Sequence, residues 1–126
     1  SVSGELLYNT KKDEFSPNLF LRVGKDRFGI LGIESLTNDP VYDALFGRMR
    51  GNYGVYAGIM RNKLGGGVSY EENRWKFNAD LFDPDDLTMR IRGSYALDDN
   101  FFITGQSIFP HSRRGGGEYI GLGYNY

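Results

Sequence analysis

Charged side chains recur at every second position in the middle of this chain. Lys76 and Asp80 alternate with apolar residues in one segment, and Arg90 and Arg92 do so in a later one. Because alternate residues of a β-strand point to the same face, each segment carries charges on one face and apolar groups on the other. On the inside of a closed sheet such charges would form an ion-pair network, or a positive surplus there would attract lipid phosphates. The residues assigned to this inner face are Arg22, Arg48, Arg74, Lys76, Arg90, Arg92, Glu71 and Asp80.

Further side chains fall on the same inner face by their spacing along the strands. Arg27 and Glu5 would extend the charged set. A group of apolar residues would make one sector of the interior less polar, either as packing or as part of a path for acyl chains. This group is Phe20, Leu31, Phe46, Tyr56 and Met60.

The residue types give little support to catalysis. His111 is the single histidine, and no Ser, Asp or Glu can be placed beside it from the sequence. The acidic run Asp83–Asp86 lacks the spacing of an EF-hand and is interpreted as a solvated turn rather than a calcium site. The glycine runs 65–67 and 115–117 do not lie between a strand and a helix, as a phosphate-binding loop requires. We therefore expect no enzymatic activity, no cofactor and no metal.

The elements that would position these residues are short β-strands separated by turns. The pattern predicts an all-β fold, namely a closed antiparallel up-and-down transmembrane β-barrel of ten strands, with eight as the alternative. In the middle of the chain, a tight turn at Glu72-Asn73 would place Glu71 opposite Arg74. The predicted strands are Ser3–Thr10, Pro17–Gly24, Arg27–Ser35, Val41–Met49, Tyr53–Arg61, Leu64–Glu71, Arg74–Phe82, Leu87–Leu97, Phe101–Ile108 and Gly117–Tyr126.

The segment Asp39–Arg50 is the one that fits two structures. Its opening Asp-Pro suits the N-terminus of a short helix. Against a helix, Leu45, Gly47 and Met49 alternate with other residues as they would in a strand. A strand here brings the number to ten, the even number that a closed barrel with both ends on one side requires, so we favour the strand.

Length and composition bound the class of protein. A chain of 126 residues with a net charge of −1 is a single domain, 1–126, without the charge surplus that would favour nucleic acid. It has no apolar run of about 18 residues, and its mean hydropathy of −0.46 suits barrel strands that are apolar on one face only. The absence of cysteine excludes disulfides and thiolate metal sites. Because no signal peptide begins at Ser1, we expect a mature chain or a domain excised from a longer one, and we favour the excised domain.

Connection lengths and aromatic residues favour a membrane barrel over a soluble sandwich. Every second connection is a short turn and most of the others are longer, as in outer-membrane barrels whose termini face the periplasm. On the apolar face, aromatic side chains gather at the short-turn end, which is typical of a membrane interface. We therefore expect a location in the bacterial outer membrane with periplasmic termini. The predicted interface aromatics are Phe28, Tyr53, Tyr70, Trp75, Tyr95, Phe101 and Tyr124.

The final segment, Glu118–Tyr126, would form a strand with one wholly apolar face that ends in two tyrosines. It resembles the C-terminal strand by which outer-membrane barrels are recognised by their insertion machinery, so we expect that machinery as a partner. A half-buried strand of a soluble β-sandwich has the same pattern. The predicted insertion signal is Ile120, Leu122, Tyr124 and Tyr126.

A family resemblance extends from Tyr42 to the end of the chain. The motifs GIMRNKLGGGVSY, FNADLFD, RIRGSYALDDNFFITG and YIGLGYNY occur in that order. Together they resemble the C-terminal β-barrel attached to some MlaD-like lipid-transport proteins of the MCE (mammalian cell entry) family. The first forty residues match only as a pattern of strands.

The resemblance implies an outer-membrane anchor, and in one version a lipid-passing barrel, for a transenvelope phospholipid transport system. Its implied partners are outer-membrane lipids and an upstream MCE domain and stalk of the same chain, with a homo-oligomer left open and nucleic acid not expected. Two rival functions also remain open: a free-standing small outer-membrane barrel with a structural or adhesion role, and a soluble lipocalin-like lipid carrier.

Overall fold

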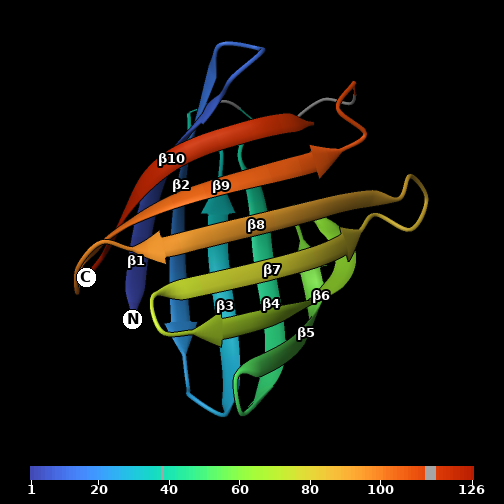
Figure 1. Ribbon diagram of the computed structural model, residues 1–126. Helices are drawn as coiled ribbons and strands as arrows, with labels where there is room; N and C mark the ends of the chain where they lie inside the picture. Colours follow the sequence, from blue (N-terminus) through green and yellow to red (C-terminus); the bar gives the residue numbers. More distant parts are fainter. Residues whose placement is uncertain (38, 113–115) are drawn as a thin grey trace.

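The computed structural model is a closed barrel of ten antiparallel strands (Figure 1). It describes residues 1–37, 39–112 and 116–126, which contain no helix and so none that is long and apolar enough to cross a membrane. Sequential strands pair, and β1 pairs with β10 to close the sheet, which confirms the predicted ten-stranded up-and-down fold. The strands are β1 (Val2–Asn9), β2 (Glu14–Val23), β3 (Arg27–Glu34), β4 (Val41–Arg50), β5 (Tyr53–Met60), β6 (Lys63–Glu72), β7 (Trp75–Phe82), β8 (Thr88–Ala96), β9 (Phe101–Phe109) and β10 (Gly117–Asn125).

Both chain termini lie at one end of the barrel, together with the turns β2–β3, β4–β5, β6–β7 and β8–β9 (Figure 1). We call this the terminal end and the opposite one the distal end. The ambiguous segment forms β4, so the strand prediction for Asp39–Arg50 is confirmed over Val41–Arg50. At the distal end, Arg61 and Asn62 connect β5 to β6 with φ angles of 50° and 69°. Two successive positive φ angles are typical of the type I′ hairpin turn, which Asn tolerates well.

The β6–β7 hairpin is shifted by two residues from the predicted register. Glu71 lies opposite Lys76 instead of Arg74, and Glu72 lies opposite Trp75. Asn73 has a φ of 55°, so the turn is centred one residue later than predicted. A shift of two keeps every side chain on its original face, since the side-chain period of a strand is two.

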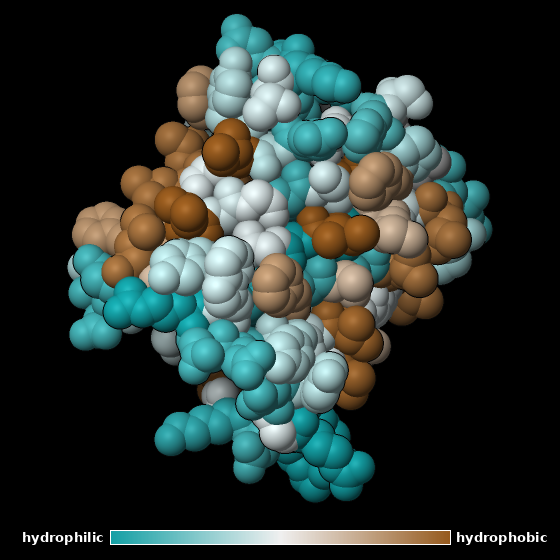
Figure 2. Space-filling view, in the orientation of Figure 1, coloured by the Kyte–Doolittle hydropathy of each residue, from teal (hydrophilic) through white to brown (hydrophobic). Residues whose placement is uncertain are grey.

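The barrel wall separates an apolar outer face from a polar inner one. Val55, Val68 and Ile91 are about half exposed on the outside, whereas Asp80 and Arg90 are buried inside. In Figure 2, brown apolar side chains spread over the middle of the visible face and teal polar ones gather at its two ends. This is the reverse of an ordinary soluble barrel, whose apolar face is its core.

Large inner side chains pack against glycines of the neighbouring strand. The ring of Phe28 occupies the space that a side chain at Gly47 would fill, and the ring of Phe102 does the same at Gly123. Phe28 and Gly47 are direct partners in the β3–β4 pair, as Phe102 and Gly123 are in β9–β10. These pairs let a narrow lumen hold aromatic rings without overpacking.

Two predicted positions of arginines are wrong. Arg48 and Arg27 lie opposite one another on the outer face of the β3–β4 pair and are exposed. They cannot face inward, because side chains alternate along a strand and the neighbouring positions, Gly47 and Phe28, face the lumen. The Phe28 ring fills the space at this level.

The predicted facing of the apolar residues of β3 and β4 is also wrong. Leu31 and Phe46 are 59% and 78% exposed and point outward. Phe28, predicted to be an interface aromatic, is buried in the lumen, and Ile30 lines the cavity there. Both faces of these strands are apolar, so hydropathy alone does not choose between them.

Candidate functional site

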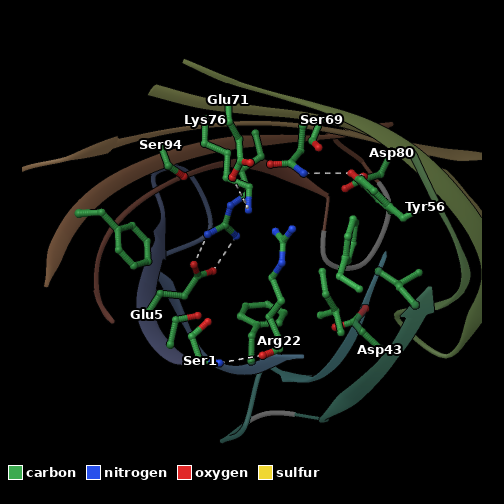
Figure 3. Close-up of a pocket in the computed structure, with 18 of the residues that line it drawn as sticks. Ser1, Glu5, Arg22, Asp43, Tyr56, Ser69, Glu71, Lys76, Asp80 and Ser94 are labelled. Carbon is green, nitrogen blue, oxygen red and sulfur yellow. Dashed lines mark hydrogen bonds and ion pairs between the residues drawn. The ribbon is translucent and has the colours of Figure 1, made fainter. Parts of the chain in front are cut away.

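A cavity of about 470 Å³ occupies the lumen at the terminal end (Figure 3). Ser1 and Asn125 border it beside the termini, and Asp80 and Arg90 line its inner part. The size falls within the range of small-molecule sites. Two walls of different chemistry enclose it, an apolar one built from β2–β5 and a polar one built mainly from β1 and β6–β8.

The apolar wall consists of aromatic and aliphatic side chains. Phe20, Ile30 and Leu45 line it, and Leu45 packs with Met60 in a buried cluster. Tyr56 ends this wall, since its hydroxyl contacts the carboxylate of Asp80 and accepts a hydrogen bond from Asn78 at 3.0 Å.

A buried ion-pair layer closes the inner end of the cavity. Arg90 donates to Glu34 at 2.7 Å and to Asp80 at 3.0 Å, and Arg61 reaches Glu34 from the distal side at 2.9 Å. Glu34, Asp80 and Arg90 are all less than one tenth exposed. Charges so buried are tolerated only when they are paired and hydrogen-bonded, so this layer is a structural element of the lumen.

The layer separates the terminal cavity from a second one of about 300 Å³ at the distal end. Arg61, Gln106 and Tyr119 line the second cavity, while Arg90 and Asp80 line the first. Glu34 bridges the two arginines. Within the described residues, the ion-pair layer therefore lies between these two cavities.

Arg92 belongs to a second buried ion pair on the polar wall. Its two terminal nitrogens donate to the two carboxylate oxygens of Glu5, one of them at 2.8 Å. Asn18 donates to the same carboxylate at 2.8 Å. This forked arrangement is the strong form of an ion pair, and it neutralises Arg92.

The remaining cations of the cavity are less well compensated. Lys76 lies 3.6 Å from Glu71, and both side chains are about 40% exposed, which indicates contact with water in the lumen. Arg74 is exposed at the rim and donates to the carbonyl oxygens of Ala96 and Leu97. None of the ion pairs within 4.0 Å among the described residues includes Arg22.

Aromatic side chains form contacts around the outside of the terminal end. Ring centroids lie 4.9 Å apart in the Tyr53–Tyr70 pair and 4.8 Å apart in the Trp75–Tyr95 and Phe101–Tyr124 pairs. Tyr126 continues the last pair at 4.8 Å from Tyr124, and the outward side chains of Ile120 and Leu122 lie farther along β10. Nearby, the backbone N–H groups of Phe101 and Asn100 donate to Asp98 in the β8–β9 turn and hold its pKa below the usual value.

The other residues considered for catalysis or metal binding in the sequence do not come together in one site among the described residues. His111 stacks on Phe109 with centroids 4.7 Å apart at the distal end. Among the described residues, no three His, Cys, Asp or Glu side chains are placed to hold a metal. Residue 115 of the second glycine run lies outside the described residues.

Sequence reasoning missed Glu34, Asp43 and Arg61. Glu34 and Asp43 lie on β3 and β4, whose facing was predicted in reverse, and Arg61 was assigned to a strand end. A signal existed, because the six arginines and one lysine assigned to the inner face outnumber the three acids assigned there, and buried cations require carboxylates from other strands. Had Glu34 been placed inside for that reason, Phe28 and Ile30 would have followed by the two-residue period.

The comparisons with known proteins give one match. A family model described as a lipocalin-like domain matches residues 33–123. No curated protein and no solved structure matches the chain. The resemblance to MlaD-like MCE proteins is therefore wrong, since the matching family is a different one. Its motifs are runs of glycine, aromatic and alternating residues, and a small barrel with inner glycine–aromatic pairs and an apolar outer face requires such runs whatever its family.

Proposed function

The chain belongs to the family of lipocalin-like domains, and from this premise we propose that it is a non-catalytic lipid-binding barrel that works with its outer face embedded in a membrane. The observation that carries this proposal is the direction of the apolar face. Lipocalin barrels hold one small ligand in their interior, whereas this barrel carries most of its exposed large apolar side chains on the outside and buried charges in its lumen.

The apolar outer face is too continuous for a free soluble monomer. Exposed aliphatic residues occur on most strands, for example Leu21, Val55, Val68, Ile91 and Leu122. Monomeric soluble proteins rarely expose contiguous apolar patches beyond about 300–600 Å². Hydrocarbon tails would cover this face without cost, since a closed barrel leaves no backbone group unpaired toward lipid.

The dimensions support the same location. Strands of eight to ten residues are about 26–33 Å long at about 3.3 Å per residue. Tilted by about 40°, they would span about 20–25 Å, close to the apolar band of outer-membrane barrels. Aromatic residues also mark the distal rim, where Tyr8 and Phe15 lie 5.1 Å apart and Tyr42 is exposed, so both interfaces would carry aromatic belts.

We therefore place the barrel in the bacterial outer membrane with its termini on the periplasmic side. The terminal cavity is the ligand chamber in this proposal, because it joins an apolar wall to a charged one. The ion-pair layer below it serves as a floor, so we assign binding rather than conduction to the lumen.

The embedding is tested with Trp75, the single tryptophan of the chain. Its ring lies on the outer face at the terminal rim, half exposed and 4.8 Å from the ring of Tyr95. In vesicles we expect lipids brominated near the headgroup to quench its fluorescence, and lipids brominated at the chain ends to quench it less.

A matched control moves the tryptophan inside. In the variant Trp75→Phe/Phe20→Trp the only indole would line the terminal cavity and should escape brominated lipids. Equal quenching of both proteins, or a chain that stays folded and monomeric in water without detergent, would contradict the membrane proposal.

A soluble lipid carrier is the second candidate, and the family match favours it. In that case another surface must cover residues such as Phe46, which is 78% exposed. Folding in water as a defined oligomer, with Trp75 shielded from aqueous quenchers, is the result that would favour this candidate.

A further inference from the structure

Arg22 projects from β2 into the middle of the terminal cavity, and its guanidinium meets no carboxylate there (Figure 3). The guanidinium carbon lies 4.1 Å from the centre of the Phe28 ring, which is buried beneath it. A cation–π contact fixes the position of the group but leaves its hydrogen-bond donors unused. The donors therefore point into open space in the cavity.

Two other cations approach the same space. The ammonium group of Lys76 lies within electrostatic reach of both Arg22 and Arg92. Glu5 neutralises Arg92 through both carboxylate oxygens, and Glu71 compensates Lys76 only at 3.6 Å. Among the described residues, no carboxylate pairs with the positive charge of Arg22. In a half-enclosed space lined by several cations, such a surplus attracts an anion.

The opposite wall has a different preference. Phe20, Ile30, Leu45 and Met60 present apolar surface to the same cavity, and Leu45 and Met60 also belong to one buried cluster. Water makes no hydrogen bonds to that wall, whereas an alkyl chain packed against it would remove apolar surface from water. The cavity of about 470 Å³ can hold an anionic head with one chain but is smaller than a two-chain phospholipid.

We propose that the terminal cavity binds a single-chain anionic amphiphile, with its carboxylate or phosphate head between Arg22 and Lys76 and its chain along the apolar wall. The proposal deepens the lipid-binding function proposed above by naming the class of ligand. The planar guanidinium of Arg22 suits two oxygens of either head group. Arg90 and Arg92 take no direct part, because Glu34, Asp80 and Glu5 already neutralise them.

The site is tested by titrating the barrel in a neutral detergent and measuring binding calorimetrically. The probes are dodecanoate, dodecyl phosphate, dodecanol and inorganic phosphate. We expect both anionic amphiphiles to bind at one per barrel, and dodecanol and inorganic phosphate to bind at least about tenfold more weakly. Each lacks one of the two interactions, the charge-assisted hydrogen bonds or the apolar contact.

The decisive variant is Arg22→Gln, which should lower the affinity for both anionic amphiphiles about tenfold or more and leave the affinity for dodecanol unchanged. Arg50→Gln is the matched control, since it removes the same charge from an exposed position on the outer face. Circular dichroism must show that Arg22→Gln keeps its sheet content. Because this residue makes no ion pair, its replacement should leave the barrel folded.

Three outcomes would overturn the proposal. Equal weakening of binding by Arg22→Gln and Arg50→Gln would indicate that the probe only partitions into a charged micelle. If inorganic phosphate bound as tightly as dodecyl phosphate, the site would recognise only an anion. If dodecanol bound as tightly as dodecyl phosphate, the site would be only an apolar pocket. The membrane location is tested separately by Trp75 quenching, so either proposal can fail without the other. If the barrel is soluble in water, the same titration is done without detergent.

Discussion

Arg27 lies directly opposite Arg48 across the β3–β4 pair, on the outer face near the terminal end. Both are exposed, and neither takes part in an ion pair within 4.0 Å among the described residues. Like charges directly opposite one another destabilise a strand pair. At the edge of an apolar band, the phosphates of anionic lipids would turn this repulsion into attraction, at about 1 kcal/mol per arginine.

We predict that anionic lipids stabilise the barrel through this arginine pair. In nanodiscs, its melting temperature should be higher with phosphatidylglycerol than with phosphatidylcholine. The double variant Arg27→Gln/Arg48→Gln should lose most of that difference, and Lys11→Gln/Lys12→Gln in the β1–β2 connection should keep it. A difference that persists in the arginine variant would assign the effect to other groups.

Strand positions could be predicted from the sequence because they depend on local features. Turn residues and two-residue alternation placed ten strands, and the β6–β7 register error of two residues changed no facing. The barrel closes through β1 and β10, which an even strand number anticipated.

The facing of β3 and β4 could not be predicted in the same way, because it depends on the whole barrel. Phe28 is inside because Gly47 leaves room for its ring, and Phe46 is outside although its size suits a core. Glu34 is inside because Arg90 and Arg61 reach it from other strands. Such long-range partners leave no local pattern, so the unpaired Arg22 was recognised only in three dimensions.

The contact between Gly123 and Phe102 gives a prediction about packing. A methyl group at Gly123 would overlap the Phe102 ring, which is its partner across β9–β10. Gly123→Ala should therefore lower the free energy of unfolding by about 1–3 kcal/mol, as overpacking does. Chemical denaturation in detergent measures this loss. In a Phe102→Ala background the same substitution should cost little, and an equal cost in both backgrounds would exclude the ring as the cause.

Arg90 gives a prediction about the ion-pair layer. It is 7% exposed and donates to Glu34 and Asp80, so Arg90→Gln leaves both carboxylates with one cation fewer. We expect a loss of about 3–5 kcal/mol in unfolding free energy, measured by denaturant titration. The exposed outer residue Arg50 supplies the control, since Arg50→Gln should change stability by no more than about 0.5 kcal/mol. If Arg90→Gln left stability unchanged while weakening amphiphile binding, Arg90 would belong to the ligand site instead.

The last prediction concerns Glu34 and Asp43, two buried carboxyl groups that influence one another electrostatically. Among the described residues, Glu34 Oε2 and Asp43 Oδ2 have no hydrogen-bond partner, whereas Asp43 Oδ1 accepts from the backbone N–H of Arg61 at 2.9 Å. The layer thus places three carboxyl groups, counting Asp80, around the guanidinium groups of Arg61 and Arg90. One carboxyl group is in excess.

The two residues should therefore respond differently to the loss of a carboxylate. Asp43→Asn removes the excess acid, supplies an N–H for Glu34 and keeps the oxygen that accepts from Arg61, so stability should stay equal or rise by about 1 kcal/mol. Glu34→Gln removes the anion that two arginines share and should cost about 3–5 kcal/mol. Denaturant titration of both variants in one detergent measures the contrast. Equal losses would show that both carboxylates are required as anions, and that the layer is balanced by a cation outside this group.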